Sequence, residues 1–490
     1  MTAPGWIALN RFGLGATPGD APPLHPQPYL VDQLARFDPK PALIAAMPLT
    51  NDTLVRLLHQ RDAIRDAKNN PDAKVAAEKS RGQFLRRAYT QQSLARVQTA
   101  LVSPTPFAER LTAFWANHFA VSADKDETRG IVGNLEFEAI RPNLNRSFIN
   151  MWAAVMTHPA MLLYLDQAQS IGPHSLAADA TAGRGKPLGL NENLAREAME
   201  LHSMGVRSGY SQADVTELAR ALTGFSVEGL GRGLPPRLKG GVDGAPGKFI
   251  YRPAFHEPGT RTVLGKQYRD NEARQPLAIL VDLAARPETA THIATKLARH
   301  FIADDPPPAA VQRIAAAFQR SGGDLPTVHR ALVECPEAWV PAPGRFKSPW
   351  DWTISAMRGL GMAERMAALS VAPSPVAPAP GATPNAPPPP SPIERMIGTF
   401  AELGQPIWRP GSPAGWSDVD AAWAGPDALL RRVEVAQRLV AFASPTLDAR
   451  ALAPQLLGTL HPATERMLAA ADSPRQALAL MLAAPEFQRR

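Results

Sequence analysis

The spacing of apolar residues predicts α-helices along most of the chain. Apolar side chains recur every three or four positions, which places them on one face of a helix. The longest predicted helix covers residues 72–102, with Pro71 at its start and Pro104 beyond its end. The helices with the clearest end signals cover 191–203 and 211–224. Further helices are predicted at 30–37, 41–47, 51–66, 106–119, 134–147, 149–157, 159–169, 272–285, 287–302, 308–320, 325–334, 350–366, 393–403, 426–443, 448–457, 462–470 and 474–484.

One stretch interrupts the helical pattern. Residues 249–265 read FIYRPAFHEPGTRTVLG, in which apolar and aromatic residues flank a Pro258-Gly259 turn on both sides. This arrangement predicts a short β-hairpin. We therefore expect a mainly α fold, a large multi-helix orthogonal bundle with one small β-hairpin around 249–265.

Three stretches have the composition of loops. Residues 171–188 are rich in Gly, Ala and Ser, and residues 226–248 are rich in Gly and Pro. Residues 371–392 hold ten prolines in 22 positions and no charged residue. Such a composition cannot build a core and favours polyproline II. The stretch is predicted to be a linker or an inserted loop.

The composition excludes several classes of protein. The chain has 490 residues, of which 45% are hydrophobic, enough for a large core. The net charge of +7 is not gathered into a run of Lys and Arg, so we expect no nucleic-acid partner. The single cysteine, Cys335, excludes an intrachain disulfide, a zinc site built from several cysteines and a CxxC redox pair.

The sequence shows no targeting or membrane segment. The N-terminal residues MTAPGWIALNRFG lack the basic and apolar regions of a signal peptide. The longest uncharged stretch, 148–165, is broken at His158-Pro159 and predicts two short buried helices. These patterns predict a soluble protein without a membrane span, cytoplasmic by default.

The strongest chemical signal lies in residues 191–205, NENLAREAMELHSMG. On a helix, Asn193, Arg196, Glu197 and Glu200 share one face, and apolar residues occupy the opposite face. Two interpretations fit. The face could be a solvated stripe with an Arg196–Glu200 ion pair. Alternatively it faces inward, where two carboxylates one turn apart could bind a divalent cation, of unknown identity, or carry out acid–base chemistry.

Histidines from other parts of the chain could join this face. His118 lies on an aromatic stripe, where it is either a core residue or a group whose pKa is lowered by desolvation. His256 stands beside Glu257, just before a tight turn, and could be a ligand or a proton carrier. His158 is predicted to cap a helix. Asp166, at the end of an apolar helix, needs a cationic partner, and we expect an arginine.

Several long segments, in one order, resemble a known family. They are ALNRFGLGATPGD, FWANHFAVS, HPAMLLYLDQAQS, NENLAREAMELHSMGV, GYSQADVTELARALTGF, FHEPGTRTVLGK and LGQPIWRPGSPAGW. Together they are similar to the bacterial DUF1800 family, from about residue 7 to the C-terminus. The resemblance implies one large helical unit over 1–490, with the proline-rich stretch as an insertion. The resemblance does not assign a reaction, a cofactor or catalytic residues to this chain.

The resemblance also suggests a partner and a compartment. Genes of this family often lie beside genes of DUF1501, which has an alkaline-phosphatase-like fold, so a DUF1501-like protein is a candidate partner. Many members look exported, whereas this chain shows no leader. His256-Glu257 stands where the family pattern suggests His-Asp, a change that preserves the carboxylate.

Two functions follow as hypotheses. The first is an enzyme for metal-assisted or acid–base hydrolysis of a polar substrate such as a saccharide or ester. Its site would comprise Glu197, Glu200, Arg196, His118 and His256, with Arg196 holding an oxyanion or fixing a carboxylate. The second is a non-enzymatic binding or assembly protein that acts with a separately encoded enzyme.

Overall fold

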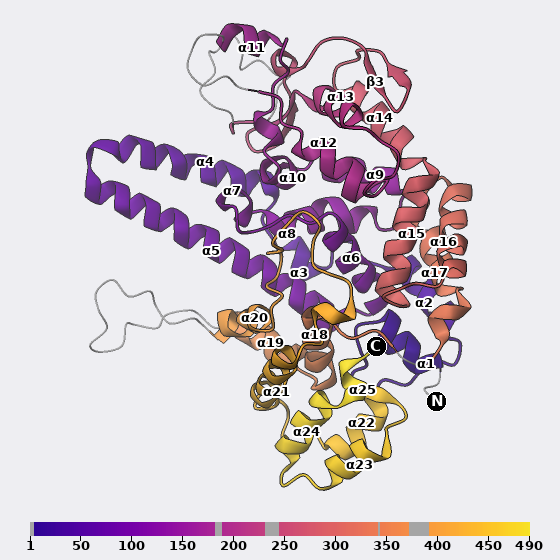
Figure 1. Cartoon of the computed structure of the whole chain (residues 1–490). Helices are drawn as coiled ribbons and strands as arrows, with labels where there is room; N and C mark the ends of the chain where they lie inside the picture. Colours follow the sequence, from indigo (N-terminus) through magenta and orange to yellow (C-terminus); the bar gives the residue numbers. More distant parts are fainter. Residues whose placement is uncertain (1–3, 182–188, 231–244, 342–343, 372–391) are drawn as a thin grey trace.

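The computed structural model describes residues 4–181, 189–230, 245–341, 344–371 and 392–490. The fold is mainly α, as predicted. Figure 1 shows the helices gathered around one body, with two long helices projecting from it. Among the described residues, no helix combines the length and the apolar composition that a membrane span requires. Most of the predicted 371–392 stretch, and residues 231–244 of the predicted 226–248 loop, lie outside the described residues.

The first third of the chain forms the projecting pair of helices and the centre of the body. Its helices are α1 (Pro4–Ile7), α2 (Pro26–Arg36), α3 (Ala42–Ala45), α4 (Thr50–Asp66), α5 (Pro71–Val102), α6 (Pro106–His118), α7 (Asp126–Arg129), α8 (Val132–Asn134), α9 (Phe148–Met156) and α10 (Pro159–Tyr164). Two π-helical segments, Ala8–Phe12 and Leu135–Ile140, lie between them.

The remaining helices pack around this centre. They are α11 (Leu176–Thr181), α12 (Asn193–Glu197), α13 (Gln212–Leu222), α14 (Arg274–Ala284), α15 (Pro287–Phe301), α16 (Pro308–Ser321), α17 (Leu325–Val333), α18 (Pro349–Gly359), α19 (Ala363–Val371), α20 (Pro392–Glu402), α21 (Pro426–Val440), α22 (Ala449–Leu457), α23 (Pro462–Ala469), α24 (Pro474–Ala483) and α25 (Pro485–Gln488). Helix α11 lies within the stretch 171–188, where we expected only a loop.

Local sequence signals set several helix ends. The His158-Pro159 break separates α9 from α10, and the His158 imidazole caps α10 by accepting a hydrogen bond from the Ala160 amide at 3.1 Å. Ser211 and Asp214 form the capping box at the start of α13. In each case a side chain satisfies a backbone N–H group that the first turn of a helix leaves unpaired.

The structure contradicts the predicted pairing of strands across Pro258-Gly259. Strand β2 (Phe249–Tyr251) pairs with β1 (Phe225–Val227), and β3 (Arg261–Val263) pairs with β4 (Lys266–Tyr268). The tight turn of the observed hairpin lies at Leu264-Gly265 and not at Pro258-Gly259. Leu264 and Gly265 both adopt positive φ angles, of 50° and 77°. Two consecutive positive φ angles are typical of the two-residue turns that match the twist of a hairpin.

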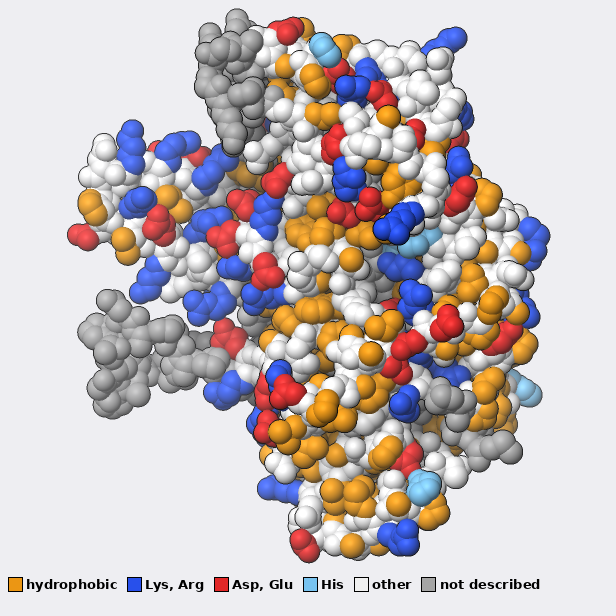
Figure 2. Space-filling model, viewed as in Figure 1, with side chains coloured by type: hydrophobic (Ala, Val, Ile, Leu, Met, Phe, Trp, Pro, Cys, Tyr) orange, Lys and Arg blue, Asp and Glu red, His pale blue; other side chains and the backbone are white. Residues whose placement is uncertain are grey.

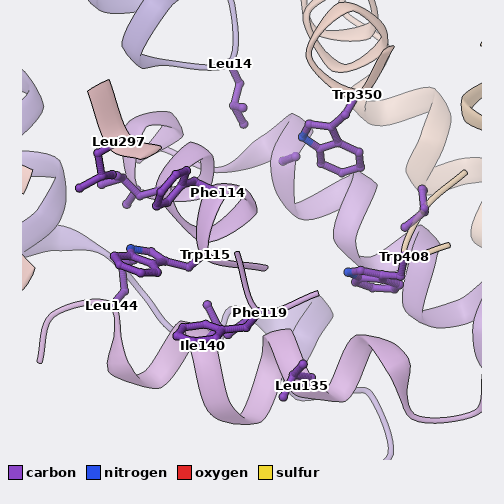
Figure 3. Packing of buried hydrophobic residues seen from close by; sticks show 14 of the residues in the cluster. Leu14, Phe114, Trp115, Phe119, Leu135, Ile140, Leu144, Leu297, Trp350 and Trp408 are labelled. Carbon is purple, nitrogen blue, oxygen red and sulfur yellow. The ribbon is translucent and has the colours of Figure 1, made fainter. Parts of the chain in front are cut away.

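A single large hydrophobic cluster extends from Ile7 to Phe487 among the described residues. Trp115, Trp152 and Trp352 are the largest side chains that are fully buried in it. Figure 3 shows the part of this cluster around α6, including Phe114, Trp115 and Phe119. Helix α6 is therefore buried on most of its surface, and its polar residues must find partners inside the protein.

Candidate active site

The predicted acidic face lies on α12 and on the π-helical segment Ala198–His202 that follows it, and the face is half-buried. The apolar side of this helix packs inward, and Glu197 and Glu200 are partly exposed on the other side. Arg196 forms ion pairs with Glu192 at 3.1 Å and with Glu200 at 3.9 Å. The Arg196–Glu200 pair of the first interpretation is thus present, and the carboxylates are neither fully solvated nor enclosed.

Burial and charge repulsion perturb the groups on this face. Burial raises the pKa of Glu197, and the neighbouring Glu200 carboxylate raises it further. Burial also raises the pKa of Tyr164 to about 12, with Glu197 adding to the effect. The Tyr210 hydroxyl donates a hydrogen bond to Glu200, and the pKa of Tyr210 is about 12 because of burial and this carboxylate.

His118 lies in the aromatic core and not on the acidic face. Its Nε2 donates a hydrogen bond to the carbonyl oxygen of His202 at 3.1 Å, and its ring stacks edge-on against Phe119 at 4.5 Å. Burial lowers the pKa of His118 well below its usual value, and Lys296 lowers it further. His202 is turned inward by the π-helical segment Ala198–His202 that continues α12.

His256 is held at the other end of this region by α13. Its Nδ1 donates to the Thr223 carbonyl oxygen at 3.1 Å, and its Nε2 lies 3.4 Å from Asp270. The neighbouring Glu257 carboxylate pairs with His174 at 2.6 Å.

The five predicted site residues therefore do not form one cluster. Within the described residues, no hydrogen bond, ion pair or ring contact joins His118 or His256 to Glu197 or Glu200. In the same part of the chain, no group of three or more His, Cys, Asp and Glu residues is placed to hold a metal ion. Asp166 has a cationic partner, as expected, but it is Lys125 at 2.6 Å and not an arginine.

A different set of residues, both polar and apolar, lines a cavity in the body. The cavity has a volume of about 70 Å³. A single water molecule needs about 10–15 Å³ by this measure, so there is room for several waters or a small functional group. The lining residues are Arg96, Arg110, Ala113, Ala116, Asn117, Ala120, Val121, His300, Ser348, Trp350, Asp351, Gln405, Pro406, Ile407, Trp408, Pro410, Trp416, Ser417 and Asp418.

A histidine–aspartate pair stands at one side of this cavity. The Nδ1 atom of His300, at the end of α15, lies 2.9 Å from both carboxylate oxygens of Asp418. Burial lowers the pKa of His300, although Asp418 opposes this effect. Burial alone would raise the pKa of Asp418, but His300, Arg490 and Arg345 together outweigh burial and lower this pKa to about 2. The carboxylate is therefore ionised, and the imidazole is neutral near pH 7.

A buried ion-pair network adjoins the pair, and two of its members, Arg110 and Asp351, also line the cavity. Arg110 donates from Nη1 to Asp351 at 3.0 Å and from Nε to the Gly13 carbonyl oxygen at 2.6 Å. Arg490 lies 3.4 Å from Asp351 and 3.4 Å from Nε2 of His300. Arg110 and Arg490 thus both lie against the Asp351 carboxylate, an opposite charge of the kind that the low dielectric of a protein interior requires.

Two tryptophans and an arginine form another part of the cavity wall. The guanidinium of Arg96 lies between the indole rings of Trp350 and Trp408, 4.2 Å and 5.0 Å from their centroids. Both rings are visible in Figure 3. Glu136 accepts a hydrogen bond from Trp408 Nε1 at 3.1 Å and forms an ion pair with Arg96 at 2.8 Å. Stacking and ion pairing hold the guanidinium plane in one orientation.

The segment 405–418 crosses the body and covers the cavity. Asn117 on α6 holds it by two hydrogen bonds to the Trp416 backbone, of 2.7 and 2.9 Å. A side chain at Gly415 would clash with the Asn117 backbone, and the φ of 79° also requires glycine there. Trp408 adopts a φ of 48°, a strained conformation for an aromatic residue. This segment therefore has one well-defined path over the cavity.

Sequence reasoning missed His300 and Asp418, which lie 118 positions apart. One signal was present: His292, Lys296 and His300 recur every four residues on an otherwise amphipathic helix, a polar stripe directed at the body. Two of the segments that resemble DUF1800, FWANHFAVS and LGQPIWRPGSPAGW, supply cavity residues, but nothing in the sequence indicated that they meet.

Comparisons with known proteins identify the family of this chain. No curated protein and no solved structure matches it. The family profile described as "Protein of unknown function (DUF1800)" matches residues 7–489, nearly the full length. The chain therefore belongs to the DUF1800 family.

Proposed function

We propose that this protein is an enzyme that carries out acid–base hydrolysis of a polar substrate in the cavity of the body, with His300 as the base. One observation carries the proposal: the imidazole of His300, only 13% exposed and bonded through Nδ1 to the Asp418 carboxylate, lines a cavity. A histidine oriented by a carboxylate is the arrangement by which many hydrolases activate a nucleophile.

The hydrogen bonding defines the role of each atom. Because the ionised Asp418 accepts at Nδ1, the proton of the neutral imidazole resides there and Nε2 keeps its lone pair. Arg490 Nη1 approaches Nε2 only to 3.4 Å, a long contact that a water molecule can displace. The nearby guanidinium also lowers the pKa of His300, which keeps the base form populated at neutral pH.

The remaining cavity residues supply charge stabilisation and shape. Arg110 is fixed by Asp351 and by the Gly13 carbonyl oxygen, so its positive charge is preorganised to stabilise an oxyanion. The Trp350 and Trp408 rings form an apolar wall that excludes water from one side. We infer that an ester or a similarly polar carbonyl group enters this space.

Hydrolysis of p-nitrophenyl acetate by the full chain tests the proposal. We expect His300→Asn to lower kcat/KM by about 10²–10⁴-fold, the usual contribution of a general base. His25→Asn, which changes an exposed histidine, should leave the rate unchanged. A wild-type rate equal to that of buffer, or equal rates for wild type and His300→Asn, would contradict the proposal. Co-purification with a partner such as a DUF1501-like protein, without turnover, would support the assembly hypothesis.

The predicted face of Glu197, Glu200 and Arg196 is a separate acid–base proposal. The raised pKa of Glu197 supports it, because a general acid must hold its proton near neutral pH. Glu197→Gln should then lower the same hydrolysis rate, whereas Glu127→Gln, on an exposed residue, should not. Elemental analysis of wild type and Glu197→Gln tests the metal-assisted version, which fails if neither protein carries stoichiometric metal.

A further inference from the structure

Helices α4 and α5 form an arm that projects from the body. Figure 1 shows the two helices side by side, extending well beyond their neighbours. Most residues from His59 to Gln83 are exposed or half-buried, so the outer part of the arm buries little apolar surface. A helix pair that is polar on nearly all sides gains little stability from packing. The projecting and mostly polar shape of the arm is therefore typical of an element that contacts another molecule.

The arm carries much of the positive charge of the protein. Residues 50–90 contain nine Lys and Arg and five Asp and Glu, a net charge of +4 out of +7 for the chain. Figure 2 shows Lys and Arg side chains spread over the arm. The acids are partly neutralised along the arm itself: Asp62 pairs with Arg65 at 3.0 Å and Glu78 with Lys74 at 3.9 Å.

A groove of about 690 Å³ lies between the two helices near the base of the arm. Two arginines and several glutamines line it, among them Arg56, Arg87, Gln60, Gln83 and Gln91. Of the described carboxylates, none lies within ion-pair distance of Arg56 or Arg87. The single lining carboxylate, Asp52, hydrogen-bonds to Asn51 at 3.2 Å. The groove therefore offers two positive charges against one negative charge, and a row of amides, to a ligand.

We propose that this groove binds an extended, acidic peptide segment of a partner protein. Arg56 and Arg87 can each hold a carboxylate through two parallel hydrogen bonds. Glutamine amides carry both a donor and an acceptor, so they can bond the N–H and C=O groups of an extended backbone. The volume of the groove exceeds what a single small anion fills.

The same residues disfavour the other polyanions. Single-stranded nucleic acids bind by stacking bases on open aromatic faces. The aromatic ring that lines the groove, Phe84, has a face covered by the Arg56 guanidinium, 4.6 Å from its centroid. A membrane surface requires an exposed apolar face beside the basic residues, and the outer arm is mainly polar.

Fluorescence anisotropy with the full chain tests the proposal. The probes are a fluorescein-labelled peptide of alternating glutamate and alanine and an oligonucleotide of equal net charge. We expect the peptide to bind, and the double variant Arg56→Glu/Arg87→Glu to weaken its binding by about tenfold or more. The control Arg466→Glu/Arg475→Glu makes the same charge change at exposed positions on α23 and α24, and should change binding less than about twofold.

Three outcomes would overturn the proposal. They are the absence of peptide binding, an equal loss in both double variants, and tighter binding of the oligonucleotide than of the peptide. Thermal unfolding followed by circular dichroism confirms that each variant is folded. If Arg56→Glu/Arg87→Glu is not, the single variant Arg87→Gln replaces it and should still weaken peptide binding measurably. Because the groove shares no residue with the cavity of the body, the result does not depend on the hydrolysis assay.

Discussion

At the scale of single residues, Lys347 lies in an environment that is unfavourable for its positive charge. Its side chain is fully buried, and within the described residues its Nζ atom has no hydrogen-bond partner. It lies 4.0 Å above the ring centroid of Phe487. Burial lowers the pKa of Lys347 to about 7, and the positive charge of Arg110 contributes to the shift. The folded protein therefore holds this proton less tightly than the unfolded chain does.

This difference predicts how stability depends on pH. Between about pH 7 and pH 10.5 the unfolded chain binds the proton and the folded protein does not, so the free energy of unfolding rises with pH. Lys347→Met should abolish this rise and stabilise the protein at pH 7 by about 1–4 kcal/mol, because no ammonium is then buried. Urea unfolding at several pH values measures both effects. Lys79→Met, at an exposed site, should reproduce neither.

In contrast to Lys347, the buried residues Arg141 and Glu109 form an ion pair with each other. Their side chains are 1% and 7% exposed, and two hydrogen bonds of 2.6 and 2.9 Å join them. Glu109→Gln leaves the guanidinium without its counter-charge, so we expect the free energy of unfolding to fall by about 3–5 kcal/mol. Asp32→Asn breaks the exposed pair with Arg36 and should lower it by no more than about 0.5 kcal/mol. Similar losses for the two variants would contradict this account.

The residues that sequence reasoning found and missed differ in the range of their interactions. His158 was correctly predicted to cap a helix, since its partner lies two residues away. His300 and Asp418 form a pair only because α15 and the segment 405–418 meet in space. The acidic face at Glu197 was visible as a helical pattern, but no pattern shows which histidines approach it. Side-chain partners that lie far apart in the sequence could therefore not be predicted from it, whereas a local partner could.

At the scale of elements, Asp214 joins α13 to the hairpin of β3 and β4. One of its carboxylate oxygens accepts a hydrogen bond from the Ser211 amide at 2.8 Å, which completes the capping box. The other accepts from the Leu264 amide at 2.6 Å, in the turn of the hairpin. The hairpin turn is therefore placed by the start of a helix some 50 residues earlier in the chain, which explains why its position could not be predicted from local turn residues alone.

Removing this carboxylate should destabilise the protein more than removing an ordinary cap. We expect Asp214→Ala to lower the free energy of unfolding by about 2 kcal/mol, because the carboxylate half of the capping box and the charge-assisted hydrogen bond from the Leu264 amide are both lost. Ser473→Ala removes only the cap of α24 and should lower it by about 1 kcal/mol. Burial alone would raise the pKa of Asp214, but its hydrogen bonds to Ser211 and Leu264 outweigh burial and lower this pKa. The contribution of Asp214 to stability is therefore present above about pH 4 and is lost as pH falls through the lowered pKa. Denaturant titrations at two pH values test both statements.

Helix positions were the most predictable elements because their signals are local. Pro71 begins α5, and Ser211 and Ser473 cap α13 and α24 as their sequences indicate. Strand pairing was not predictable, since β2 pairs with β1 across a connection of more than 20 residues. Three-residue strands also carry too few side chains to show an alternating pattern.

At the scale of the whole molecule, the body and the arm differ in what stabilises them. Helices α6 and α15 bury most of their apolar residues in the large cluster. The outer arm relies on its own backbone hydrogen bonds and on ion pairs between exposed side chains. Such pairs contribute little, and isolated helices are only marginally stable in water. The arm should therefore open without the body unfolding.

Hydrogen–deuterium exchange measured by mass spectrometry can separate these two behaviours. We expect amides in residues 61–82 to exchange at least about a hundredfold faster than those of α6, because local opening exposes them at a lower free energy. Amides of α15 should match those of α6, since both helices lie in one cluster. If the arm is a docking element, the acidic peptide should slow exchange in the arm and leave α6 unchanged. Equal protection of the arm and α6 in the free protein would show that the arm unfolds only with the body, and the division into a rigid body and a separately opening arm would be wrong.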